Sequence, residues 1–187
     1  MAGSNTFKFG LSNLRVAEIT VTAGVYSYGT LTPWPGAISM TATPKGDIEP
    51  IEADNTDYKV LDKSEGYDIE LETLEIPEAV ADIILDRTED TKKVATEYVG
   101  KTYPAFALVG QINGDQYNSR FEFMDCVVVA RPEIAAKTSK SKNPDNFKIK
   151  LRARPRTSDN LVMMSTQSDT DATVYANWFT AVTEPTA

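Results

Sequence analysis

The chain has 187 residues, and its 19 Lys and Arg against 27 Asp and Glu give a net charge of −8. It contains no His, which excludes imidazole-based nucleophile pairs and His-ligated zinc, and its single Cys126 excludes an internal disulfide or a multi-cysteine metal site. No apolar run approaches the ~20 residues that a helix needs to cross a bilayer. We therefore expect a protein that is not an enzyme, with no cofactor, no metal and no membrane partner.

Apolar residues alternate between turn signals along most of the chain, which predicts β-strands. The expected strands are 37–43, 57–61, 67–74, 94–98, 105–112, 119–130 and 147–153, with a shorter one at 174–179. The pair Asn113-Gly114 predicts a hairpin between two of them. Only 77–86 is typical of a helix, because Pro77 suits its first position and one face is apolar. The pattern predicts a mainly β fold: an antiparallel β-sandwich or barrel with one short α-helix packed on it.

Three segments of this single domain, 1–187, do not fit a compact core. They are an N-terminal arm at 1–30, a long loop at 131–146 and a C-terminal extension at 157–187. Isolated apolar anchors lie in the arm and the extension, namely Phe7, Phe9, Leu11, Trp178 and Phe179. Buried aromatic anchors are typical of subunit contacts. Two alternatives stay open for these five residues. They dock onto another subunit, as inter-ring anchors, or they dock onto the chain's own domain.

Two charge ladders alternate with apolar residues at strand spacing. Cations occupy the even positions Lys148, Lys150, Arg152, Arg154 and Arg156, and acids occupy Asp68, Glu70 and Glu72. Both ladders could be solvated outer faces of a half-buried sheet. They could instead neutralise each other, across adjacent strands or between subunits, at roughly 0.2–1 kcal/mol per pair. Binding of nucleic-acid phosphates by the cations is disfavoured, since no aromatic residue interleaves with them and the chain is acidic overall.

Short motifs follow one another in a fixed order along residues 8–155. They are Phe9-Gly10-Leu11-Ser12-Asn13-Leu14, Tyr28-Gly29, Pro33-Trp34-Pro35-Gly36-Ala37, Ala53-Asp54-Asn55 with Tyr58, Tyr67-Asp68-Ile69-Glu70-Leu71, Ile76-Pro77-Glu78 and Phe106-Ala107-Leu108-Val109-Gly110. In this order they resemble the major tail (tail tube) proteins of long-tailed, non-contractile bacteriophages of Gram-positive hosts. The Ala-Asp-Asn-x-x-Tyr turn followed by the acidic strand is the most specific part.

The resemblance implies a structural virion protein. Its subunits self-assemble into stacked, typically hexameric rings that form the tail tube, the conduit for genomic DNA during ejection. The implied partners are further copies of the chain, a tape-measure protein in the lumen, tail terminator and tail-tip proteins, and DNA in transient, non-specific passage. The implied location is the virion, after assembly in the cytoplasm of the bacterial host.

The resemblance also gives the unusual segments a purpose. Residues 1–30, 40–66 and 131–146 are expected to contact the ring above or below. The acidic ladder is expected to face the lumen or a ring interface, because a net-negative lumen lets DNA slide. The cationic ladder is then expected either on the outer surface or paired with acids. Such pairs could form between subunits or within one chain.

The alternative is a monomeric β-sandwich binding module of the adhesin-like or carbohydrate-binding kind. Acids near Asp54 would hold calcium in such a module, and Trp34 or Trp178 would stack on a sugar. Self-association without ligand distinguishes the two functions.

Overall fold

The computed structural model describes residues 10–53, 56–96, 98, 100, 102–115, 117–130, 132 and 146–185, and for 47–53, 56–64 and 88 it describes the backbone alone. The strands are β1 Leu11–Thr22, β2 Val25–Tyr28, β3 Thr32–Pro33, β4 Ala37–Ala53, β5 Thr56–Thr73, β6 Thr88–Glu89, β7 Ala95–Thr96, β8 Phe106–Ile112, β9 Arg120–Ala130, β10 Phe147–Ala153 and β11 Met163–Ser165. The helices are α1 Glu78–Leu85 and α2 Ala172–Asn177. Phe7, Phe9 and nearly all of the predicted loop 131–146 lie outside the described residues.

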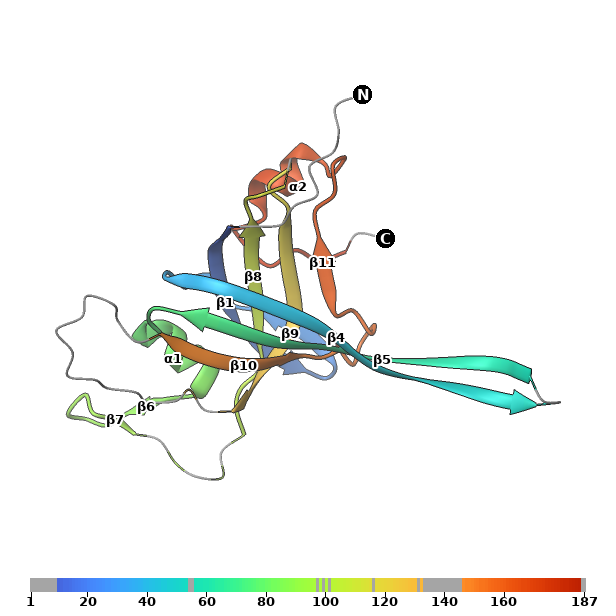
Figure 1. The fold of residues 1–187 in the computed structure, drawn as a ribbon. Coiled ribbons are helices and arrows are strands. Elements are labelled where there is room, and N and C mark those ends of the chain that lie inside the picture. Colours follow the sequence, from blue (N-terminus) through green and yellow to red (C-terminus); the bar gives the residue numbers. More distant parts are fainter. Residues whose placement is uncertain are drawn as a thin grey trace.

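Nine of the strands form one antiparallel sheet. Its order is β2-β1-β8-β9-β10-β5-β4, with β3 added beside β1 and β11 beside β9, while β6 and β7 form a separate ribbon. In Figure 1 the strands β4, β5 and β10 cross β1, β8 and β9 steeply, so the sheet folds over into two layers. The predicted mainly β, antiparallel fold with a short helix is confirmed.

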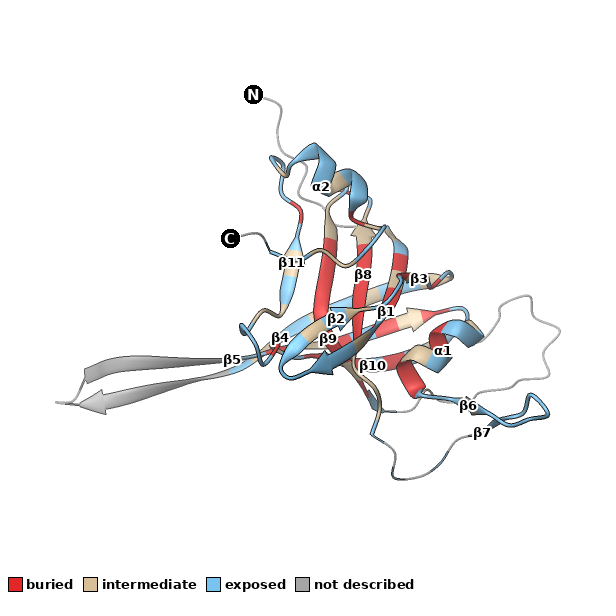
Figure 2. Cartoon of the chain, turned by 180° about the vertical axis from the view of Figure 1, so that it is seen from behind, coloured by how far each residue is buried: buried red, intermediate tan, exposed pale blue. Residues whose placement is uncertain are grey.

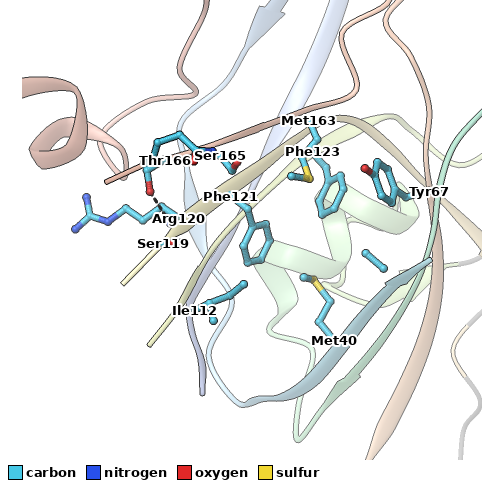
Figure 3. Close-up of a pocket in the computed structure, with 12 residues that line it drawn as sticks. Met40, Tyr67, Ile112, Ser119, Arg120, Phe121, Phe123, Met163, Ser165 and Thr166 are labelled. Carbon is cyan, nitrogen blue, oxygen red and sulfur yellow. Dashed lines mark hydrogen bonds between the residues drawn. The ribbon is translucent and has the colours of Figure 1, made fainter. Parts of the chain in front are cut away.

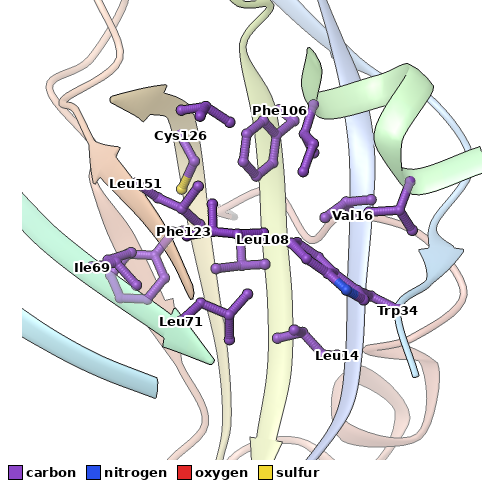
Figure 4. Close-up of a cluster of buried hydrophobic side chains, with 14 of the residues drawn as sticks. Leu14, Val16, Trp34, Ile69, Leu71, Phe106, Leu108, Phe123, Cys126 and Leu151 are labelled. Carbon is purple, nitrogen blue, oxygen red and sulfur yellow. The ribbon is translucent and has the colours of Figure 1, made fainter. Parts of the chain in front are cut away.

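The hydrophobic core fills the space between these layers, as Figure 4 shows. Trp34, Phe106, Phe123 and Leu71 are among its largest fully buried side chains, and Figure 2 shows the buried residues concentrated on the central strands. Helix α1 covers one end of the core with its apolar face, and Asp86 ends the helix in the left-handed conformation. The helix predicted at 77–86 is therefore confirmed.

The thiol of Cys126 lies in the same core. It is fully buried, and this burial raises its pKa. The expected role of Cys126 as a small apolar core residue is consistent with this position.

Residues 1–9 of the predicted N-terminal arm, 1–30, lie outside the described residues. From Leu11 onward the prediction of an arm is wrong, because the chain there forms strand β1. It lies between β2 and β8, and its Leu14 and Val16 are buried in the core. Ala17, on the opposite face, is also buried, because the C-terminal segment packs there. A strand buried on both faces loses the apolar–polar alternation that would have identified it.

The strand expected at 174–179 is also wrong, because this stretch contributes to helix α2. The side chain of Asp171 accepts hydrogen bonds from the backbone N–H groups of Thr173 and Val174, which caps a helical turn. The sequence pattern does not predict strand β11, since it is three residues long and is exposed or half-buried throughout.

The β4–β5 hairpin is the most unusual feature of the fold. Pairing of β5 with β10 ends at Tyr67, opposite Ala153. Beyond Gly66, within the described residues, β4 and β5 pair with each other alone out to the pair Ala53 and Thr56. Figure 1 shows this part as a two-stranded ribbon that projects from the body of the protein. We call residues 46–53 and 56–65 the projecting hairpin.

Candidate assembly surfaces

The two predicted charge ladders lie side by side on one exposed face. The register of β5 and β10 places Glu72 opposite Lys148, Glu70 opposite Lys150 and Asp68 opposite Arg152. We call these six residues the charged face. The Lys150 Nζ lies 3.1 Å from Glu70 Oε1, and the Arg152 Nε donates to Asp68 Oδ1 at 2.9 Å. Of the interpretations left open by the sequence, the structure shows neutralisation across adjacent strands, on side chains that are also solvent-exposed.

The last two cations of the ladder leave this face. Arg154 lies just past the end of β10 and pairs with Asp125, with 2.7 Å between the Arg154 Nη2 and Asp125 Oδ1. Arg156 is buried, and of its two predicted positions, on the outer surface or paired with acids, the structure shows the second. Its guanidinium donates to Asp159, to both carboxylate oxygens of Glu184 at 2.9 Å and to the Tyr28 hydroxyl at 3.2 Å. The buried charge is thus fully compensated within one chain.

Charge reversal on the charged face tests whether these pairs stabilise the chain. We expect Glu70→Lys to lower the free energy of unfolding by about 0.5–1 kcal/mol, because it places two cations opposite each other. The swapped variant Glu70→Lys/Lys150→Glu should recover most of this loss. Urea unfolding at low and high salt measures both values. Equal losses in the single and the swapped variants would contradict the pairing, and Glu18→Lys, elsewhere on the sheet, controls for net charge.

An apolar groove opens along the edge of the sheet beside β4. Two adjoining cavities of about 460 Å³ and 410 Å³ form it, and both are lined by Met40, Ala42 and Ile112. Tyr67, Phe121, Phe123 and Met163 extend its wall into the sandwich, as Figure 3 shows, and Leu11 and Ile38 line its other end. We call these nine residues the edge groove.

Arg120 is the one charged side chain that borders the larger cavity among the described residues. Its guanidinium points away from the cavity in Figure 3 and lies 3.7 Å from the ring centroid of Tyr175. Its backbone N–H donates to the Thr166 hydroxyl at 2.9 Å, which fixes the polar rim. The wall of the edge groove is therefore almost uncharged, although a quarter of the chain's residues are charged.

Two of the predicted inter-ring anchors dock onto their own chain. Trp178 is 2% exposed and packs against Ala17 and Val109 on the outer face of β1 and β8. Phe179 is half-buried beside it, with the guanidinium of Arg15 at 5.5 Å from its ring centroid. Of the two open alternatives, docking within the chain holds for Trp178 and Phe179.

The remaining predicted anchors lie near the start of the chain. Leu11 is partly buried and borders the edge groove. Phe7 and Phe9 lie outside the described residues, so their predicted contact with another ring stays a prediction.

The C-terminal segment also covers a buried carboxyl that no sequence motif marks. Glu122 on β9 is 0% exposed, and its Oε1 accepts a hydrogen bond of 2.7 Å from the backbone N–H of Thr183. Its Oε2 is buried without a hydrogen-bond partner. Burial is the main cause that raises the pKa of Glu122 to about 7. The one sequence signal is an acid between two apolar aromatic residues, Phe121 and Phe123.

This carboxyl predicts a loss of stability as the pH rises. The folded pKa of about 7 lies above the ordinary value of 4.5, so the unfolded chain releases its proton first. The protonated Glu122 carboxyl stabilises the fold fully below about pH 4.5, and this contribution disappears as the pH passes 7. The free energy of unfolding falls by about 3 kcal/mol over this range. We expect Glu122→Gln to be more stable than the wild type at pH 8 by about 2–3 kcal/mol and similar to it at pH 5. Urea unfolding at both pH values measures this, and parallel pH profiles of the two proteins would contradict it.

Comparison of the sequence with known protein families and with curated proteins found no match in either search. Within the part of the chain that the structure describes, neither helix is long and apolar enough to cross a membrane. In that same part, no three His, Cys, Asp or Glu side chains gather where they could hold a metal ion. The projecting hairpin, the charged face and the edge groove are thus the features from which a function can be argued.

Proposed function

We propose that this chain is a structural subunit that self-assembles into stacked rings, six-fold in keeping with the resemblance, and so forms a phage tail tube. The observation that carries the proposal is the projecting hairpin. Eight residues of β4 and ten of β5 lie in this ribbon, and at ~3.3 Å per residue it extends roughly 25–30 Å beyond the body. An isolated two-stranded ribbon is marginal in water, and its unpaired edges invite pairing with another chain. Contact with a neighbouring subunit gives such a ribbon a stable environment.

The charged face supports the passage of DNA through such a tube. Lys150 and Arg152 pair directly with acids, and Lys148 lies opposite Glu72, so phosphates meet a face whose charges are largely compensated. Tight binding of DNA depends on cations that are free to replace the counterions of phosphates. A surface of this kind, if it faces the lumen, lets DNA and a tape-measure protein slide past. Tail terminator and tail-tip proteins would close the two ends in the virion.

A monomeric module that binds a small ligand is the second candidate, and the larger cavity of the edge groove favours it. Its volume of about 460 Å³ lies within the usual range of small-molecule sites. A module that binds sugar by stacking on Trp34 or Trp178 is not supported, because these side chains are buried, at 1% and 2% exposed. The predicted calcium turn at Asp54 lies outside the described residues.

Electron microscopy of the purified chain over a concentration series, with light scattering for mass, tests the proposal. We expect rings or hollow tubes to form without added ligand as the concentration rises. A monomer at every concentration, also in the presence of preformed tail tips as initiators, would contradict the tube and leave the binding module.

A further inference from the structure

The turn between β1 and β2 presents an exposed, uncharged apolar tip. Thr22 and Val25 form the last pair of the ribbon, and Ala23 and Gly24 make the turn with φ of 51° and 81°. Positive φ at both central residues defines the tight turn that closes a two-residue hairpin. Val21 is 50% exposed and Val25 is 68% exposed. We call residues 21–25 the apolar tip.

The composition of this tip is unusual for a hairpin end. No residue from 20 to 27 is charged, in a chain where a quarter of the residues are. The pairing of Val21 with Tyr26 and of Thr22 with Val25 places the two valines on opposite faces of the ribbon. The tip is therefore a thin wedge that is apolar on both sides. Charged residues commonly protect such ends from other chains, and here they are missing.

The edge groove offers an uncharged, largely apolar wall at the opposite end of the same strand. Leu11, the first residue of β1, borders the groove, whereas Thr22, its last residue, belongs to the apolar tip. Eleven steps of ~3.3 Å separate these ends by roughly 35 Å, so the tip of a chain cannot enter its own groove. The groove has a polar rim that includes Ser165, Thr166 and Gln167, but its wall is apolar. Met40 and Met163 belong to this wall, and methionine adapts its shape to an incoming group.

We propose that the apolar tip of one copy inserts into the edge groove of the next copy. This inference rests on the proposed self-assembly and names the contact that propagates it. Because the two surfaces differ, the contact is head-to-tail, and each copy keeps one free tip and one free groove for further copies. The match of two uncharged apolar surfaces, in a chain of net charge −8, selects the tip rather than a charged segment as the occupant.

Cross-linking between engineered cysteines tests the contact directly. The variant Val25→Cys/Ile38→Cys places one thiol on the tip and one at the groove, and a short bismaleimide joins only thiols in contact. Cys126 stays in place, because its buried thiol is protected from reagent. We expect a ladder of dimers, trimers and longer products, about tenfold stronger than from the matched control Val25→Cys/Val174→Cys. Val174 is also an exposed valine, but it lies on α2. Equal ladders from the two variants would overturn the proposal.

A mixing experiment then tests the head-to-tail geometry. Val25→Asp should disable the tip, and Ile38→Asp should disable the groove, each at an exposed position that leaves the melting temperature almost unchanged. Each variant alone should fail to form long products, whereas an equimolar mixture should form dimers and stop there. Long products from either variant alone would overturn the contact.

The cross-linking result and the tube result separate the two proposals. Tubes without a cross-link between the engineered thiols at positions 25 and 38 would overturn the tip–groove contact and leave the tube function standing. Cross-linked ladders without rings or tubes would support the contact and overturn the tube.

Discussion

Replacing Gly66 with Ala is expected to destabilise the fold by at least about 4 kcal/mol. Gly66 has φ of +104°, a conformation that side chains with a Cβ rarely adopt, and this strain alone costs about 1–3 kcal/mol. A Cβ at this position would lie 2.0 Å from the carbonyl oxygen of Ala153. The clash is with backbone at the end of β10, so it cannot be relieved by rotating a side chain, and β5 must move away from β10.

The variant Gly24→Ala is the matched control for this prediction. Gly24 also has a positive φ, of +81°, but a Cβ there meets no atom within 4 Å. We expect it to cost about 1–2 kcal/mol from backbone strain alone. Thermal and urea unfolding of both variants measure the difference, and a loss at Gly66 no larger than the loss at Gly24 would contradict the close contact.

Gly66 also shows why the projecting hairpin is only partly predictable from the sequence. Pro44, Gly46, Pro50 and Gly66 interrupt the apolar alternation, so the sequence predicts separate strands at 37–43, 57–61 and 67–74. Proline removes a backbone donor, which breaks a central strand but is tolerated at the edge of a sheet. Strand β4 is such an edge strand, and both prolines lie in it. Only the strand order explains why the interruptions do not end the hairpin.

The charge ladders are well predicted because they depend on local alternation. The period of two places the acids and most of the cations on one face of their strands, and the partners then follow from the pairing of β5 with β10. Which strands are neighbours is a long-range property, so the sequence leaves pairing across strands and pairing between subunits equally open. Arg156 departs from the pattern because β10 ends at Ala153 and the chain turns into the protein.

The edge groove and the buried position of Trp178 cannot be predicted, for the same reason. The groove unites side chains from β1, β4, β5, β8, β9 and β11, several of which are distant in sequence. Trp178 is buried only because the C-terminal segment returns to the outer face of β1 and β8. The sequence identifies the apolar anchors, and the topology determines whether they face the chain's own domain or solvent.

Shortening the projecting hairpin is expected to abolish assembly without unfolding the body. Replacing residues 46–65 with Asn-Gly joins Lys45 to Gly66, which are already paired, through a two-residue turn. The hydrophobic core, α1 and the charged face lie outside the deleted part, so the melting temperature of the monomer should change by only a few degrees. Loss of the ribbon's contacts with neighbouring copies should raise the concentration needed for tubes by at least about 100-fold, equivalent to about 2.8 kcal/mol.

Light scattering and electron microscopy of the shortened and full-length chains measure this effect. The matched control shortens the β6–β7 ribbon, which also lies outside the main sheet, and it should assemble at a concentration close to that of the full-length chain. Added at equal concentration, the hairpin-shortened chain should also limit the growth of full-length tubes, because its apolar tip and edge groove remain intact. Normal tubes from the hairpin-shortened chain would show that the ribbon takes no part in assembly, and the proposed function would lose the observation that carries it.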